Sequence, residues 1–346
     1  MMKILMGIWL VLSLALPASA EELIPPEVPP MGQERMPQNT DSFPDALMEL
    51  LENSAGLIRP ELEGALQISC WILFAALLTS ILPVLSEKNH SAVSIAATAA
   101  ISAVMFQHTG AMVGYASETV WELCEYGKLL CPVLTTALAA QGGVTVSAAL
   151  YAGTTAFLAL LGMLVSRLIV PMVYLFLAFS VAYSALNQEM LKKFSDAVKN
   201  LLTWLLKTLL VVFTTYMSLT GAVSGTTDTA ALKAARITIS STVPVVGGIL
   251  SDASESVLVG VGVLKNAAGI YGILAVLAVL AEPFVKIGMQ YLFLKASSAV
   301  CSLFADKSVC TLTEHFSAAM GLLLAKFATG GMLVFISTVC YLKGIG

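Results

Sequence analysis

Charged residues are scarce in this chain, and their scarcity excludes most soluble folds. Eighteen bases and 22 acids make up 12% of the 346 residues, about half the usual share in soluble domains. A water-soluble surface on a chain of this length needs more charge than that. Because 58% of the residues are hydrophobic, we expect a membrane protein.

The sequence also lacks the motifs of common catalytic and binding sites. It has three histidines and six cysteines, with no C-x-x-C pair, so no metal site is indicated. No G-x-x-x-x-G-K-[ST], H-E-x-x-H or G-x-S-x-G motif is present, which leaves nucleotide hydrolysis and familiar hydrolytic chemistry without a basis. The net charge of −4 argues against nucleic acid. We therefore expect no enzyme, no cofactor and no nucleic-acid partner.

Residues 1–20 have the pattern of a cleavable signal peptide. Lys3 supplies the positive end, Ile4 to Leu16 the apolar core, and Ala18-Ser19-Ala20 the small residues before the cleavage point. The alternative is an uncleaved first span, but the apolar core has 13 residues where a span needs about 20. Both alternatives place the following residues outside the cytoplasm.

Residues 21–63 form an acidic, proline-rich extracytoplasmic arm. They hold ten of the 22 acids, two of the 18 bases and seven of the 13 prolines. Residues 21–44 contain too few apolar side chains to offset the entropy of ordering, so we expect a disordered tether there. After Pro44, apolar residues recur at helical spacing from Ala46 to Leu51, which predicts a short amphipathic helix.

Residues 64–346 form the predicted multi-pass membrane domain, because apolar stretches near the length of a spanning helix recur along them. Eight such stretches are 65–85, 92–115, 144–165, 168–186, 201–221, 261–281, 284–304 and 320–342. A ninth, 121–140, is interrupted by charges and Pro132, and it either crosses or re-enters. Because hydrocarbon cannot satisfy an open strand edge, we expect an all-α, polytopic membrane protein with about seven to nine transmembrane helices.

The lysines indicate an orientation, since short cytoplasmic loops carry an excess of basic residues. Lys88 follows the first stretch, and Lys192, Lys193 and Lys199 follow 168–186, which is the fifth stretch when 121–140 is counted. With the arm outside, these lysines lie inside only when 121–140 crosses. That count favours nine crossings with Lys343 inside, and seven or eight remain alternatives.

Residues 222–260 are too polar for a span and too apolar for a soluble loop. A break at Pro244, Gly247 and Gly248 interrupts any helix there. Polar and charged residues surround this break: Asp228, Lys233, Arg236, Asp252, Glu255, Lys265 and Asn266. Two broken helices can line a cavity, whereas an amphipathic hairpin would rest at the interface with its charges in water. This broken amphipathic or re-entrant segment is the candidate interaction surface in both cases.

Other polar and small residues within the stretches suggest sites and contacts. Six single ionisable residues lie beside or inside spans: Arg167, Lys207, Glu282, Lys286, Lys295 and Lys326. Lys295 and Lys326 lie several residues inside their stretches, so they are the candidates for a functional charge in lipid. Gly110 and Gly114 form a G-x-x-x-G pair, which permits close helix packing.

Three segments resemble the stage III sporulation protein AE family of endospore-forming bacteria. They are I-S-S-T-V-P-V-V-G-G-I-L-S-D-A-S-E-S-V at 239–257, L-K-N-A-A-G-I-Y-G at 264–272 and C-P-V-L-T-T-A-L-A-A-Q-G-G at 131–143. The resemblance implies a multi-pass protein of the mother-cell membrane facing the forespore. It implies a channel or secretion-like complex needed for late forespore gene activity and spore development.

The resemblance also implies partners. These are other stage III sporulation proteins, a separate secretion-type ATPase that acts as the motor, and a forespore-side channel protein across the intermembrane space. The resemblance supplies no catalytic residues. The alternative is a stand-alone permease for a small solute, but such a permease should show paired internal repeats, and we find no clear duplication.

Overall fold

The described part of the chain is helical. The computed structural model describes residues 25–38, 42–85, 90–140, 144–219 and 267–345, and no strand occurs within these ranges. Its helices are α2 (Pro30–Gln33), α3 (Phe43–Ala55), α4 (Ile58–Leu85), α5 (His90–Ala140), α6 (Val144–Leu164), the π-helical turn η1 (Val165–Ile169), α7 (Val170–Leu186), α8 (Glu189–Leu219), α11 (Ala267–Cys301) and α12 (Lys307–Ile345). The all-α prediction is confirmed for these residues. The predicted signal peptide lies outside them.

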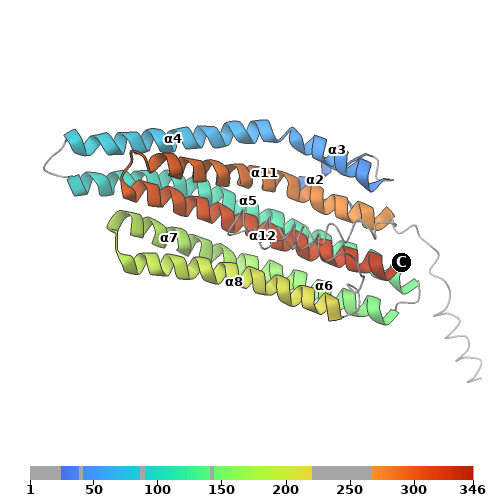
Figure 1. Cartoon of the computed structure of the whole chain (residues 1–346). Coiled ribbons are helices and arrows are strands. Elements are labelled where there is room, and N and C mark those ends of the chain that lie inside the picture. Colours follow the sequence, from blue (N-terminus) through green and yellow to red (C-terminus); the bar gives the residue numbers. More distant parts are fainter. Residues whose placement is uncertain (1–24, 39–41, 86–89, 141–143, 220–266, 346) are drawn as a thin grey trace, which may run out of the picture.

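The long helices lie side by side in one elongated bundle (Figure 1). Helix α5 alone has 51 residues, which is about 75 Å at 1.5 Å per residue. Helices α4, α5, α11 and α12 form one side of the bundle, and α6, α7 and α8 form the other. The bundle is thus much longer than the roughly 30 Å of a hydrocarbon core.

Several predicted spans are parts of single helices. Stretches 92–115 and 121–140 both lie in α5, and 144–165 continues through η1 into α7 without a turn. Stretches 261–281 and 284–304 meet in α11, which runs past Pro283. A charge or a lone proline interrupts an apolar stretch without ending a helix, because the backbone hydrogen bonds on either side persist.

Five helices of the described residues are long and apolar enough to cross a membrane, fewer than the seven to nine that we expected. They are Phe43–Ile81, Ser147–Leu186, Glu189–Ser218, Gly269–Cys301 and Lys307–Leu342.

The two ends of the bundle hold different basic residues. Asn187, in the turn between α7 and α8, lines a small pocket together with Lys307 at the start of α12. The C-terminal end of α12 lies at the opposite end of the bundle (Figure 1). The lysines near the start of α8 and Lys343 therefore lie at opposite ends of the bundle (Figure 1), whereas the expected nine crossings placed both inside; the number of crossings and the orientation stay predictions.

The described part of the arm packs on the bundle, so the expectation of a disordered tether is wrong for residues 25–38. Gly32 in α2 lies so close to α11 that an added Cβ would be 2.8 Å from the Val279 side chain. Val28 is also buried. The prolines of this segment obscure a short apolar pattern in the sequence. Its apolar residues meet their packing partner, α11, only in the folded chain. The amphipathic helix after Pro44 is confirmed as α3, which buries Phe43, Ala46 and Leu50.

Helix α12 is the centre of the core. In the most apolar part of α12, 94% of the residues are buried inside the protein. The corresponding share for the helix Phe43–Ile81 is 28%. Helix α12 contacts α5, α6, α7, α8 and α11. Polar side chains in the middle of α12, such as Lys326, are therefore enclosed by protein and kept away from lipid.

Close packing of α6 on α8 depends on Gly153. An added Cβ there would collide with the ring of Tyr216, whose hydroxyl donates a 2.7 Å hydrogen bond to the Ala149 carbonyl oxygen. We expect Gly153→Leu to lower the free energy of unfolding by about 1–3 kcal/mol, because the ring must move and the bond is lost. Thermal unfolding in detergent measures this change. Gly162→Leu on the same helix is the control, because no neighbouring atom lies within 4 Å of a Cβ at Gly162; equal losses in both variants would contradict the packing argument.

Candidate functional site

The predicted interaction segment lies outside the described residues. This applies to all ten of its residues: Asp228, Lys233, Arg236, Pro244, Gly247, Gly248, Asp252, Glu255, Lys265 and Asn266. The structure instead places a different set of charges together, about midway along the bundle. We call this set the charged belt: Arg35, Glu61, Glu282, Lys286 and Lys326.

An ion pair joins the arm to α11 within the belt. Arg35 follows α2, and its guanidinium lies 2.7 Å from the Glu282 carboxylate, with side-chain exposures of 11% and 24%. The same guanidinium donates a 2.9 Å hydrogen bond to the Met31 carbonyl oxygen. The pair is shielded from solvent, so each charge is stabilised mainly by the opposite charge of its partner. Sequence reasoning missed this pair because it assigned Arg35 to a tether, although Val28, Gly32 and Arg35 have helical spacing.

A second ion pair links α11 to α4. The Lys286 ammonium lies 3.7 Å from a Glu61 carboxylate oxygen and 4.8 Å from the centre of the Tyr115 ring. A separation of 3.7 Å is too long for a hydrogen bond. Lys286 therefore keeps donors available while its charge is balanced by Glu61 and the ring face.

Lys326 is the most enclosed charge of the belt. Its relative exposure is 0%, and its ammonium donates a 2.9 Å hydrogen bond to the Ser117 hydroxyl oxygen. The Ser117 hydroxyl in turn donates to the Val113 carbonyl oxygen at 2.7 Å. No carboxylate of the described residues lies within 4.0 Å of this ammonium. The prediction that Lys326 lies inside its span is confirmed.

The remaining single charges face outward. Lys295 lies on the surface of α11 and pairs with Glu314 at 3.2 Å, with both side chains more than half exposed. Arg167 and Lys207 are also exposed. Lys295 is thus a surface residue, and only Lys326 of the two candidate lysines is buried.

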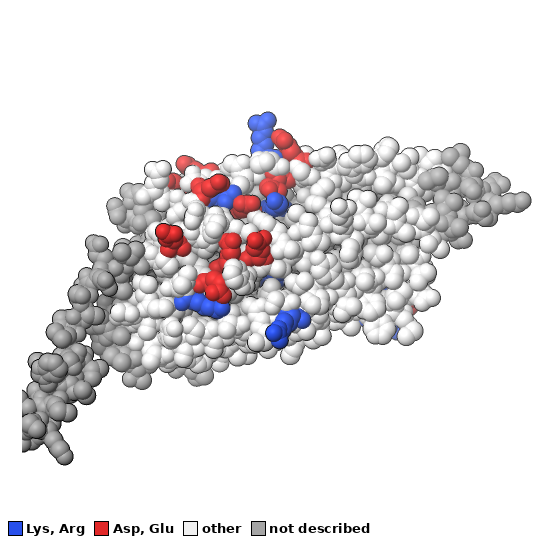
Figure 2. Space-filling model, turned by 180° about the vertical axis from the view of Figure 1, so that it is seen from behind, with Lys and Arg blue, Asp and Glu red and all other residues white. Residues whose placement is uncertain are grey.

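Figure 2 shows the distribution of charge on one face of the molecule. The acidic and basic side chains of this face gather near the middle, and a broad uncharged surface lies beside them. Such a surface suits contact with lipid.

The structure shows the state of all six cysteines. Each is a free thiol, and Cys124, Cys131, Cys301 and Cys340 are buried. In the described ranges, no group of three or more His, Cys, Asp or Glu side chains could hold a metal ion.

Comparison with known proteins decides the family. The sequence model of the family described as stage III sporulation protein AE matches residues 34–343. This chain belongs to that family. The resemblance seen in the sequence is thereby confirmed, and with it a role in sporulation.

A curated relative of the same family is the stage III sporulation protein AE of Bacillus subtilis (strain 168). It is 25% identical to this chain over 226 residues, which cover 65% of this chain and 56% of the relative. The chain thus matches just over half the length of that relative. No solved structure matches the chain. Together with the apolar helices, the family assignment makes this a membrane protein of sporulation.

Proposed function

We propose that this chain is a membrane component of a channel or secretion-like complex that links the mother cell to the engulfed forespore. It would lie in the mother-cell membrane facing the forespore and would be needed for late forespore gene activity and spore development. The family assignment is the observation that carries the proposal. The bundle of long apolar helices supports it, because it suits a component embedded in lipid.

We propose that other proteins supply the energy for this complex and form its remaining parts. The partners would be other stage III sporulation proteins, including a separate secretion-type ATPase, and a forespore-side channel protein across the intermembrane space. The chain contains no phosphate-binding loop of the G-x-x-x-x-G-K-[ST] type. In this proposal it performs no catalysis of its own.

The structure suggests an orientation for this component. Lys192, Lys193 and Lys199 lie near the start of α8, at the end of the bundle formed by the turn at Asn187. Basic residues favour the cytoplasmic side, so we propose that this end faces the mother-cell cytoplasm. The arm and the C-terminal end of α12, at the other end of the bundle (Figure 1), would then be extracytoplasmic. The segment 222–260 stays our proposed interaction surface.

Purification from sporulating cells tests the proposal. We expect the tagged chain to be recovered in detergent with other stage III sporulation proteins, among them the ATPase, and to form no transport-active unit when reconstituted alone. The same chain expressed in vegetative cells is the control for nonspecific association. Recovery as an isolated oligomer that moves a small solute across liposomes would favour the permease and contradict the proposal.

A further inference from the structure

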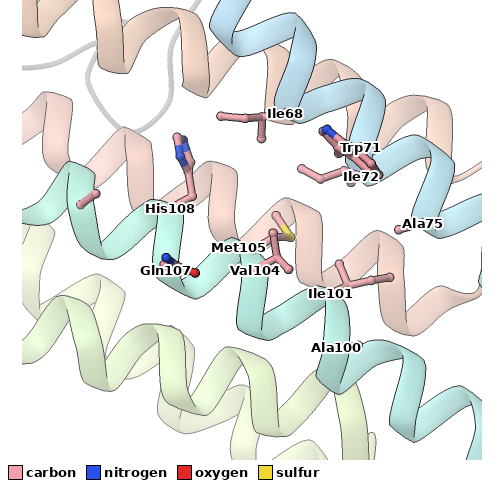
Figure 3. A pocket seen from close by; sticks show the side chains of 11 residues that line it. Ile68, Trp71, Ile72, Ala75, Ala100, Ile101, Val104, Met105, Gln107 and His108 are labelled. Carbon is pink, nitrogen blue, oxygen red and sulfur yellow. The ribbon is translucent and has the colours of Figure 1, made fainter.

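A groove opens on the side of the bundle between α4 and α5. Helix α4 packs mainly on α11 and only lightly on α5, so the two helices leave a cavity of about 610 Å³ between them. Figure 3 shows side chains of both helices along it, among them Ile68 and Trp71 of α4 and Met105 and His108 of α5. Most of the lining is apolar, and it lies beside an exposed apolar surface, since Trp71 is 63% exposed.

One end of this groove reaches the charged belt. Its α5 wall runs from Ala100 to Ala111, and Tyr115 lies one helical turn further, under the Lys286 ammonium. Its α4 wall begins at Ile68, two turns after Glu61. The groove therefore runs from an exposed apolar surface toward a charged pair that lies beyond its lining residues.

Buried polar atoms gather near this same end. His108 Nε2, Tyr115 Oη and Gln290 Oε1 make no hydrogen bond of standard geometry among the described residues, although His108 interacts with Gln290 and Tyr115 with Glu282. Gln290 is only 3% exposed and lies next to His108, which is also close to Lys286. Because none of these contacts has standard hydrogen-bond geometry, each atom could bond better to a ligand, and a ligand with both donors and acceptors would suit them and the nearby Lys286 ammonium.

The charges of this region restrict the ligand. Arg35 and Lys286 balance Glu282 and Glu61, so a polar group with both signs of charge fits better than a purely anionic one. A phosphodiester would accept hydrogen bonds from Lys286 and Tyr115, and a primary amine would donate to Gln290 and Glu61. The apolar wall accommodates a hydrocarbon chain, and the volume is in the range of ligand sites, about 300–1,000 Å³.

We propose that the groove between α4 and α5 binds one aminophospholipid of the bilayer. An acyl chain lies along Trp71 and Met105, and the zwitterionic head contacts Lys286 and the polar atoms of His108 and Gln290. This site requires only that the chain is in a membrane, so it is independent of the proposed channel complex.

Native mass spectrometry of the full-length, delipidated chain in detergent tests this site. Titration with phosphatidylethanolamine is expected to give a one-to-one complex, with weaker binding of phosphatidylglycerol. Lys286→Gln should weaken the complex about tenfold, as expected for the loss of a charge-assisted hydrogen bond. Lys295→Gln, on the exposed surface of the same helix, is the matched control and should bind as the wild type does.

A second variant keeps the test valid where Lys286→Gln fails to fold. Ala75→Phe fills the groove without changing a charge and should also prevent binding, whereas Ala159→Phe, on the exposed face of α6, should not. Glycerophosphoethanolamine, which has the head without the chains, should not bind detectably. Equal binding of both phospholipids, binding of the head alone, unchanged binding by Ala75→Phe, or occupation of the groove by a second copy would each overturn the proposal.

Discussion

Replacing Arg35 with alanine is expected to lower the free energy of unfolding of the bundle by about 3 kcal/mol or more. The Glu282 carboxylate would lose the guanidinium 2.7 Å away, in a place where only 24% of its side chain is exposed. An uncompensated charge in such surroundings costs more than the pair contributes when intact. The arm would also lose its main polar contact with α11.

Thermal unfolding in detergent measures this effect, and Arg59→Ala is the matched control. Arg59 pairs with Glu63 at 3.4 Å, but its side chain is 90% exposed, so its removal should change stability by less than about 1 kcal/mol. The double variant Arg35→Ala with Glu282→Leu should recover most of the loss, because no charge is left unpaired. If Arg35→Ala unfolds at the same temperature as Arg59→Ala, the ion pair has no structural role.

Replacing Lys326 with methionine is expected to separate stability from function. Methionine has a similar length and needs no hydration, so the free energy of unfolding should stay unchanged or rise by about 1–4 kcal/mol. Ser117 keeps its bond to the Val113 carbonyl oxygen, so no polar atom is left alone. A charge kept inside a membrane protein at such cost is typical of function, and we expect a loss of about tenfold or more in heat-resistant spores.

Spore counts after heat treatment, with unfolding temperatures of the same variants, measure both parts of this prediction. Lys207→Met is the control, because Lys207 is an exposed lysine on α8 and its loss should change neither quantity greatly. Normal spore counts in Lys326→Met would show that the buried amine has no function. A strongly destabilised Lys326→Met would show instead that the amine holds the core together.

The number of separate helices could not be predicted from hydropathy alone. The prediction ended one stretch at residue 115, began another at 121 on the far side of Glu118, and treated the second as interrupted by charges and Pro132. In the structure α5 continues through them, since charged residues with good helix propensity do not stop a helix. Only a turn stops it, and the described turn after α7 has Asn187 at φ 50°, the left-handed conformation typical of helix ends.

The close contacts between helices could not be predicted from the sequence either. The Gly110 and Gly114 pair suggested a close crossing, yet a Cβ at Gly114 would meet nothing within 4 Å. Close approaches occur instead at several other glycines, among them Gly32, Gly153 and Gly272. Spacing shows that a helix permits close approach, but the partner side chain, such as Tyr216, is supplied by a distant part of the chain.

Three sequence segments carried the family resemblance, and composition and periodicity by themselves determined that this chain is helical and belongs in a membrane. Those properties follow from the solvent and the local backbone, so they can be seen one stretch at a time. Tertiary structure alone decided that α12 is enclosed, that Lys326 lies within the bundle and that Arg35 meets Glu282. These pairings join residues more than 200 positions apart, and only packing of the whole bundle determines which side chains lose their contact with lipid and water.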